Sequence, residues 1–94
     1  MARIWVALIN ISPRTAAKIM QSHDIEPDEV RLAVVGVPGL RLAWDEHAER
    51  GRRALVTTAI PGREALIVLY PVGPPHEDEW NLGSAYFTGR RGEA

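Results

Sequence analysis

The hydrophobic pattern of this chain changes its period once, near residue 40. Before that point, apolar residues recur every three or four positions in two segments, 13–22 and 27–36, which is the spacing of amphipathic helices. After it, apolar and polar residues alternate, as they do in half-buried strands. A pair of helices followed by a run of strands predicts the α+β class, with the helices packed on one face of an antiparallel sheet.

The ends of the two helical segments are marked by residues that favour the start or the end of a helix. Ser12 is suited to cap the first helix. Pro13 and Pro27 stand at first helical positions, where proline loses no hydrogen bond because the N–H of that position has no partner within the helix. Gly36 and the pair at 38–39 end the second segment. We therefore predict helices over 13–22 and 27–36.

Five segments are predicted to be strands, in the order strand, two helices, four strands. The first, 3–11, is apolar enough to be buried on both faces. The later ones are 40–45, 52–60, 64–70 and 80–87, joined by a polar turn at 46–51, a tight turn at 61–62 and a proline-rich loop after residue 70. We expect Trp44 and Trp80 in the core or at an interface, and a core that includes Ile19, Val34, Leu42, Trp44, Ile67 and Leu69.

The length and composition are those of one small globular domain. The 94 residues are 46% hydrophobic and 24% charged, and none is cysteine. We expect a single domain over 1–94 with a flexible tail at 88–94. The apolar start is too short for a signal peptide or a membrane span, so a cytoplasmic protein without a membrane partner is expected. No cofactor is expected.

Arginine gives the clearest chemical signal. The net charge is −1, so a phosphate-binding surface would have to be local. Arg50, Arg52 and Arg53 fall within four residues, and Arg63 lies at the far end of the same predicted strand. Neighbouring residues of a strand face opposite sides, so Arg52 and Arg53 should point apart. The cluster is consistent with solvated charge that discourages sheet-to-sheet pairing, or with phosphate binding.

The histidines are not spaced as metal ligands, so no metal site is expected. His23 ends the first helix, where it could act as a capping residue. Beside one of the arginines it could instead transfer a proton in RNA cleavage, which needs a base for the 2′-hydroxyl, a cation for the phosphorane and an acid for the leaving oxygen. Tyr86 could reach the same face.

Three stretches together resemble the BrnT-type toxins, which have a RelE-like fold. They are KIMQSHDIEPDEV at 18–30, the central segments RGRR, GR and LIVLY between residues 50 and 70, and LGSA at 82–85. The resemblance implies sequence-lax RNA cleavage by the toxin of a toxin–antitoxin pair, with a protein antitoxin as partner. Carried over by position, it implies roles for His23, Arg52 or Arg53, and Lys18.

The residues and the resemblance together define the candidate site and an alternative to it. The catalytic candidates are His23, Arg52 and Arg53, and the substrate-binding candidates are Lys18, Arg50, Arg63 and Tyr86. The alternative is a non-catalytic interaction domain of the same fold, which would bind a protein or nucleic-acid partner or form a homo-oligomer through an edge strand or the Trp80 loop.

Overall fold

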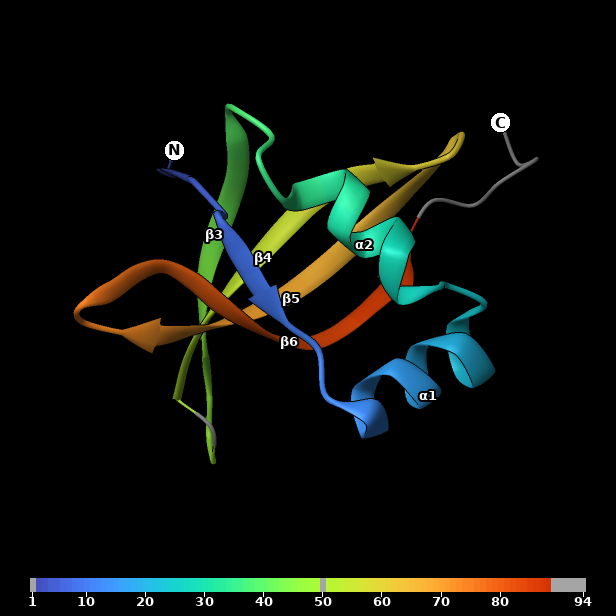
Figure 1. Ribbon diagram of the computed structural model, residues 1–94, viewed down its shortest axis with the longest axis horizontal. Coiled ribbons are helices and arrows are strands. Elements are labelled where there is room, and N and C mark those ends of the chain that lie inside the picture. Colours follow the sequence, from blue (N-terminus) through green and yellow to red (C-terminus); the bar gives the residue numbers. More distant parts are fainter. Residues whose placement is uncertain (1, 50, 89–94) are drawn as a thin grey trace.

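The computed structural model describes residues 2–49 and 51–88, and within them it has the predicted α+β class. Two short strands and two helices precede four longer strands in this part of the chain (Figure 1). The elements are β1 (Ala2–Ile4), β2 (Leu8–Asn10), α1 (Pro13–His23), α2 (Pro27–Val34), β3 (Leu40–His47), β4 (Gly51–Ile60), β5 (Arg63–Gly73) and β6 (His76–Phe87).

Both helices begin at the predicted prolines and end within two residues of the predicted ends. The Ser12 hydroxyl accepts a hydrogen bond from the Thr15 amide at 3.1 Å, as an N-cap does. At the start of α2, Glu26 and Glu29 form a reciprocal capping box. The first helix stops where Asp24 takes a left-handed backbone conformation, with φ of 56°.

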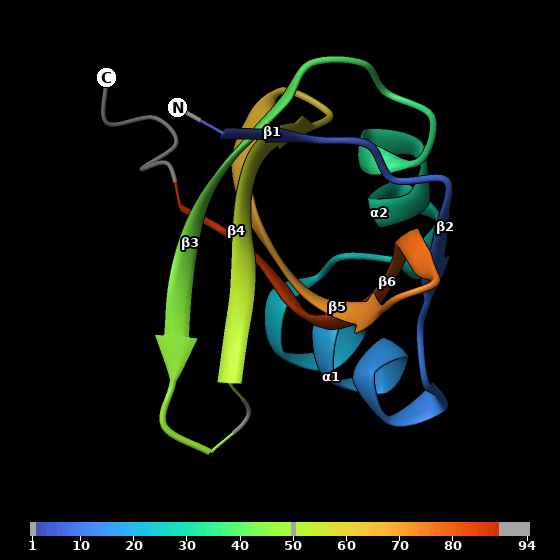
Figure 2. The same cartoon turned by 90° about the vertical axis from the view of Figure 1, so that its left-hand side faces the viewer.

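The described strands form one mixed sheet in the order β1-β3-β4-β5-β6-β2. The four long strands are antiparallel neighbours, as predicted, but β2 runs parallel to β6. The sheet is strongly curled, and both of its edges come from the opening segment of the chain. Figure 2 shows β3 and β4 on one side, β2 on the other, and the opening segment crossing between them.

The prediction of one opening strand buried on both faces is therefore wrong. The segment is divided by residues 5–7, which cross from the β3 edge to the β6 edge. Val6 is fully buried in this crossing, whereas Trp5 and Leu8 are exposed. The carbonyls of the crossing are satisfied from elsewhere: Val6 O accepts from the Gly36 amide, and Trp5 O from the Trp80 indole. These bonds replace the strand pairing that the crossing interrupts.

Two predicted loops are largely strand. β3 continues to His47, and the β5–β6 hairpin extends to Gly73 and His76. In the β3–β4 hairpin, the added length pairs Glu46 with Arg52 and His47 with Gly51 across the ladder. Opposite charges that face each other on adjacent strands stabilise the pairing, which favours strand over loop here.

One cluster of buried side chains forms the core of the described chain, between the sheet and the helices. Five of the predicted core residues are confirmed: Ile19, Val34, Leu42, Ile67 and Leu69. Trp80 is also buried, but the prediction for Trp44 is wrong, because its side chain is 39% exposed. β3 runs past the end of the core there, and the Trp44 ring contacts the Arg52 guanidinium and the Trp80 ring.

The helices leave one face of the sheet uncovered. The Thr58 hydroxyl reaches the Ala33 carbonyl of α2, and Ile19 of α1 joins the core, so both helices pack on the core side. α1 lies along β6, at the margin of the sheet (Figure 1). On the four long strands, the residues that alternate with the core residues point away from the helices, and we call the surface that they form the helix-free face. It consists of Arg41, Ala43, Asp45, His47, Arg53, Leu55, Thr57, Leu66, Val68, Tyr70, Ser84 and Tyr86.

Neither helix in the described part of the chain is long and apolar enough to cross a membrane.

Candidate functional site

A hollow of about 260 Å³ opens on the helix-free face and gathers polar side chains from α1 and the four long strands. Three of the predicted site residues, Lys18, Arg53 and Tyr86, meet there, although they are far apart in the sequence. The complete lining is Lys18, His47, Arg53, Leu55, Val68, Tyr70, Gly83, Ser84 and Tyr86.

Arg53 is held in place by Asp45, its cross-strand partner on β3. Its Nε and one terminal nitrogen each lie 2.7 Å from Oδ2 of Asp45, and its side chain is 27% exposed. The pKa of Arg53 is raised above its usual value, first by the hydrogen bond to Asp45 and second by a side-chain hydrogen bond with Tyr70. The site therefore holds a permanent cation with a fixed orientation.

Tyr70 reaches the hollow because β6 is irregular beside it. The register between β5 and β6 shifts after the Val68–Ser84 pair, and Gly83 is the extra residue on β6. The Tyr70 ring lies directly over Gly83: a Cβ atom there would stand 2.9 Å from Cδ2 of the ring and closer still to Cε2. The Gly83 carbonyl also accepts a long hydrogen bond, 3.5 Å, from Lys18 Nζ. A bulged glycine thus positions both Tyr70 and Lys18.

Adding a methyl group at Gly83 is expected to destabilise the protein through Tyr70. Gly83→Ala should lower the free energy of unfolding by about 1–3 kcal/mol, the usual cost of an added group in a tightly packed site. In a Tyr70→Ala background the same change should cost much less, because the ring that it meets is gone. Chemical denaturation of the four proteins of this cycle measures the difference. Equal costs in the two backgrounds would contradict the packing described.

His23 lies beside the site and does not line the hollow. It ends α1, is half-buried, and its ring packs tilted against Tyr86 with 5.7 Å between the ring centroids. Tyr86 thus stands between the predicted histidine and the remaining polar groups. This geometry suits a residue that orients the Tyr86 ring.

His47 is the histidine that lines the hollow, and the sequence analysis missed it. Its Nδ1 accepts a hydrogen bond from the Glu49 amide at 3.2 Å. A neutral imidazole that accepts at Nδ1 carries its proton on Nε2, so His47 has a donor there. The predicted strand ended at residue 45, so the alternation of its side chains was not followed to residue 47. Because β3 continues to His47, this side chain falls on the same face as Arg53.

The other predicted arginines lie elsewhere. Arg52 points to the opposite side of β4, with its guanidinium carbon 4.0 Å from the centroid of the Trp44 ring, so the predicted divergence of Arg52 and Arg53 is confirmed. Arg63 stacks on the Phe87 ring at 3.7 Å, at the β4–β5 turn. Arg50 and residues 89–94 of the predicted tail lie outside the described residues, and Thr88 bonds to Glu64. No group of three or more potential metal ligands occurs within 2–49 and 51–88.

Acidic side chains are concentrated away from this face. Of the residues that define the helix-free face, only Asp45 is acidic, and it pairs with Arg53. Other carboxylates lie in the α1–α2 region and the β5–β6 hairpin: Asp24, Glu26, Asp28, Glu29, Glu77, Asp78 and Glu79. Glu64 and Glu79 continue the alternation of β5 and β6 onto this side of the sheet, beyond the residues that define the helix-free face.

No protein-family model, curated protein or solved structure matches this chain.

Proposed function

We propose that this protein is a toxin-like, metal-independent endoribonuclease that binds single-stranded RNA on its helix-free face. One observation carries the proposal: Lys18, His47, Arg53, Tyr70 and Tyr86 converge on a single hollow from five different elements. Two cations and several proton-bearing groups around one hollow are the parts that phosphodiester cleavage without a metal needs.

In the proposed reaction the RNA itself supplies the nucleophile. The 2′-oxygen forms a bond to the adjacent phosphorus, the bond from phosphorus to the 5′-oxygen breaks, and the products are a 2′,3′-cyclic phosphate and a 5′-hydroxyl. Arg53 and Lys18 stabilise the charge of the phosphorane. For the proton transfers, His47 acts as the imidazolium, donates a proton to the leaving 5′-oxygen and becomes the neutral imidazole. A tyrosine of the site, Tyr70 or Tyr86, acts as the phenolate, takes the proton of the 2′-hydroxyl and becomes the neutral phenol.

As a toxin, the protein would be held inactive by a protein antitoxin. This part of the proposal rests on the resemblance of residues 18–30, 50–70 and 82–85 to the BrnT-type toxins. Expression without an antitoxin should then arrest growth, and the arrest should require Arg53.

One feature favours the alternative, a non-catalytic interaction domain. β1 pairs only with Leu40–Leu42, so no strand of the described chain borders the outer side of β3 from residue 43 to residue 47. An uncovered strand edge can pair with an extended segment of a partner or of a second copy. The Asp45–Arg53 ion pair also offsets part of the positive charge in the hollow.

Purified protein incubated with single-stranded RNA in excess EDTA distinguishes the two functions. The ribonuclease should shorten the RNA and leave 2′,3′-cyclic phosphate ends, because no metal takes part in the steps above. RNA that stays intact in the presence of folded protein would contradict the ribonuclease and favour the interaction domain.

A further inference from the structure

Two arginines face each other directly at the edge of the sheet. Arg3 on β1 and Arg41 on β3 are cross-strand partners, and both side chains are exposed. Directly opposed residues of an antiparallel pair have Cβ atoms about 4.5–5.5 Å apart, and like charges in such a pair are destabilising. Among residues 2–49 and 51–88, no side chain forms an ion pair or hydrogen bond with either guanidinium. Within the described part of the chain, this double positive charge is therefore uncompensated.

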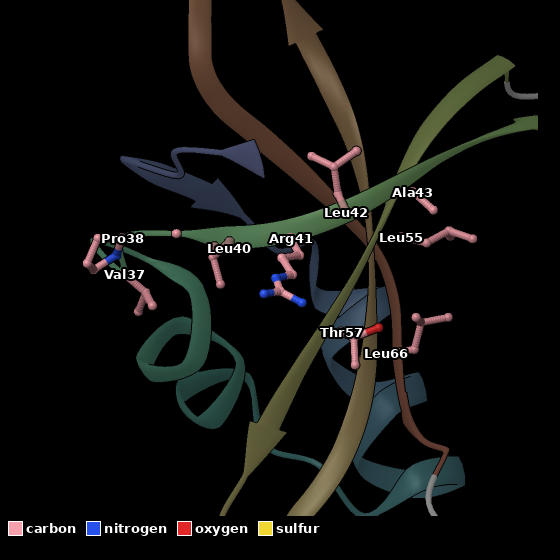
Figure 3. Close-up of a pocket in the computed structure, with 10 residues that line it drawn as sticks. Val37, Pro38, Leu40, Arg41, Leu42, Ala43, Leu55, Thr57 and Leu66 are labelled. Atoms are coloured by element: carbon pink, nitrogen blue, oxygen red, sulfur yellow. The ribbon is translucent and has the colours of Figure 1, made fainter. Parts of the chain in front are cut away.

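A second hollow, of about 1020 Å³, is lined by Arg41 of this pair. Figure 3 shows the Arg41 guanidinium projecting beside Leu40 and Thr57, and the side chains of Ala43, Leu55 and Leu66 grouped along β4. The register from Leu42–Val56 places Arg41 next to Thr57. The hollow thus has a mainly aliphatic floor, with the guanidinium of Arg41 between Leu40 and Thr57 (Figure 3).

This floor connects the arginine pair to the candidate site. Leu55 lines both hollows, so the two adjoin at this residue on the helix-free face. Arg41 and Asp45 are four residues apart on β3, a distance of about 13 Å at the rise of a strand, and Arg53 lies opposite Asp45. Two cationic positions are therefore separated by an apolar strip along one face of the sheet.

We propose that Arg3 and Arg41 bind a second phosphate of the same RNA strand whose scissile phosphate lies at Arg53 and Lys18. This inference rests on the proposed function. Paired guanidinium groups suit the several oxygens of a phosphate group, and the intervening aliphatic floor receives the nucleoside between the two contacts. The repulsion between Arg3 and Arg41 is then relieved by the bound phosphate.

Binding of a labelled, 2′-O-methylated oligoribonucleotide of about eight nucleotides, long enough to follow a groove of this kind, tests the inference. The methyl groups remove the nucleophile, so binding is measured without cleavage. In fluorescence anisotropy, the variant Arg3→Gln/Arg41→Gln should bind about tenfold more weakly at low salt. The slope of log affinity against log salt should fall by about 0.7, one phosphate contact on a single strand.

Two controls separate binding from folding and from net charge. Arg31→Gln/Arg52→Gln removes the same charge away from the helix-free face and should bind as the wild type does. Because two like charges are removed from one cross-strand pair, Arg3→Gln/Arg41→Gln should unfold at or above the wild-type temperature. A dinucleotide, too short to span both positions, should bind the wild type and Arg3→Gln/Arg41→Gln equally.

The results distinguish this inference from the proposed function. Wild-type affinity and salt slope in Arg3→Gln/Arg41→Gln, with a loss in Arg53→Ala, would overturn only the second phosphate contact. A wild-type protein that does not bind the oligoribonucleotide would overturn both proposals. Equal weakening in Arg3→Gln/Arg41→Gln and in the Arg31/Arg52 control would show a general effect of charge and would also overturn the inference.

Discussion

Replacing Arg53 with alanine is expected to slow RNA cleavage by about 10²–10³-fold, the usual effect of removing one group that stabilises transition-state charge. Arg52→Ala is the matched control, because Arg52 is the adjacent residue and points to the opposite side of β4. It should cleave RNA at close to the wild-type rate. Because both variants lose an arginine side chain and one positive charge, a difference in their cleavage rates reports only on the position of the arginine.

Loss of folding would not account for this difference. Asp45, which Arg53→Ala leaves without its partner, has a side chain that is 40% exposed, so water can solvate its carboxylate. Arg53→Lys keeps the positive charge but not the two bonds to Asp45, and it should recover only part of the rate. Circular dichroism of each variant checks the fold. Slower cleavage by Arg52→Ala, with an unaffected rate in Arg53→Ala, would contradict the proposal, because it would place the chemistry on the side of β4 opposite the helix-free face.

Replacing His47 with alanine is expected to slow RNA cleavage by about 10²–10⁴-fold, the range for removal of a positioned proton-transfer group. His76→Ala is the control: its side chain is 61% exposed and lies near Glu79 in the β5–β6 hairpin. His23→Ala should have an intermediate effect, because it removes only the ring that packs against Tyr86. A larger loss in His23→Ala than in His47→Ala would return the catalytic role to the end of α1.

The class of fold and the position of its helices could be predicted because they depend on local pattern. Ser12, Pro13 and Pro27 mark helix starts through the geometry of one or two residues, and the change of period near residue 40 marks the start of the long strands. The division of the opening segment is different. It follows from the curl of the whole sheet, which brings β3 close enough to pair with β1 and β6 close enough to pair with β2. No property of residues 3–11 alone specifies that curl.

The candidate site was predicted only in part, for a similar reason. Lys18, Arg53 and Tyr86 are residues whose chemistry is visible in the sequence. His47 and Tyr70 join them through the register of the β3–β4 hairpin and the bulge at Gly83, both of which depend on pairing between strands. Trp44 was misplaced because alternation identifies the face of a strand but not the point where the core ends.

The central claim is that RNA lies on the helix-free face, and NMR mapping of the binding surface tests it most directly. The 2′-O-methylated oligoribonucleotide is added to isotope-labelled protein, and the shifts of the backbone amides are followed. The amides of Arg53, Tyr70 and Ser84 should shift most, and those of α2, which packs on the other side of the sheet, should stay in place. Shifts confined to α2 or to the β5–β6 hairpin, with none around Arg53, would contradict this account.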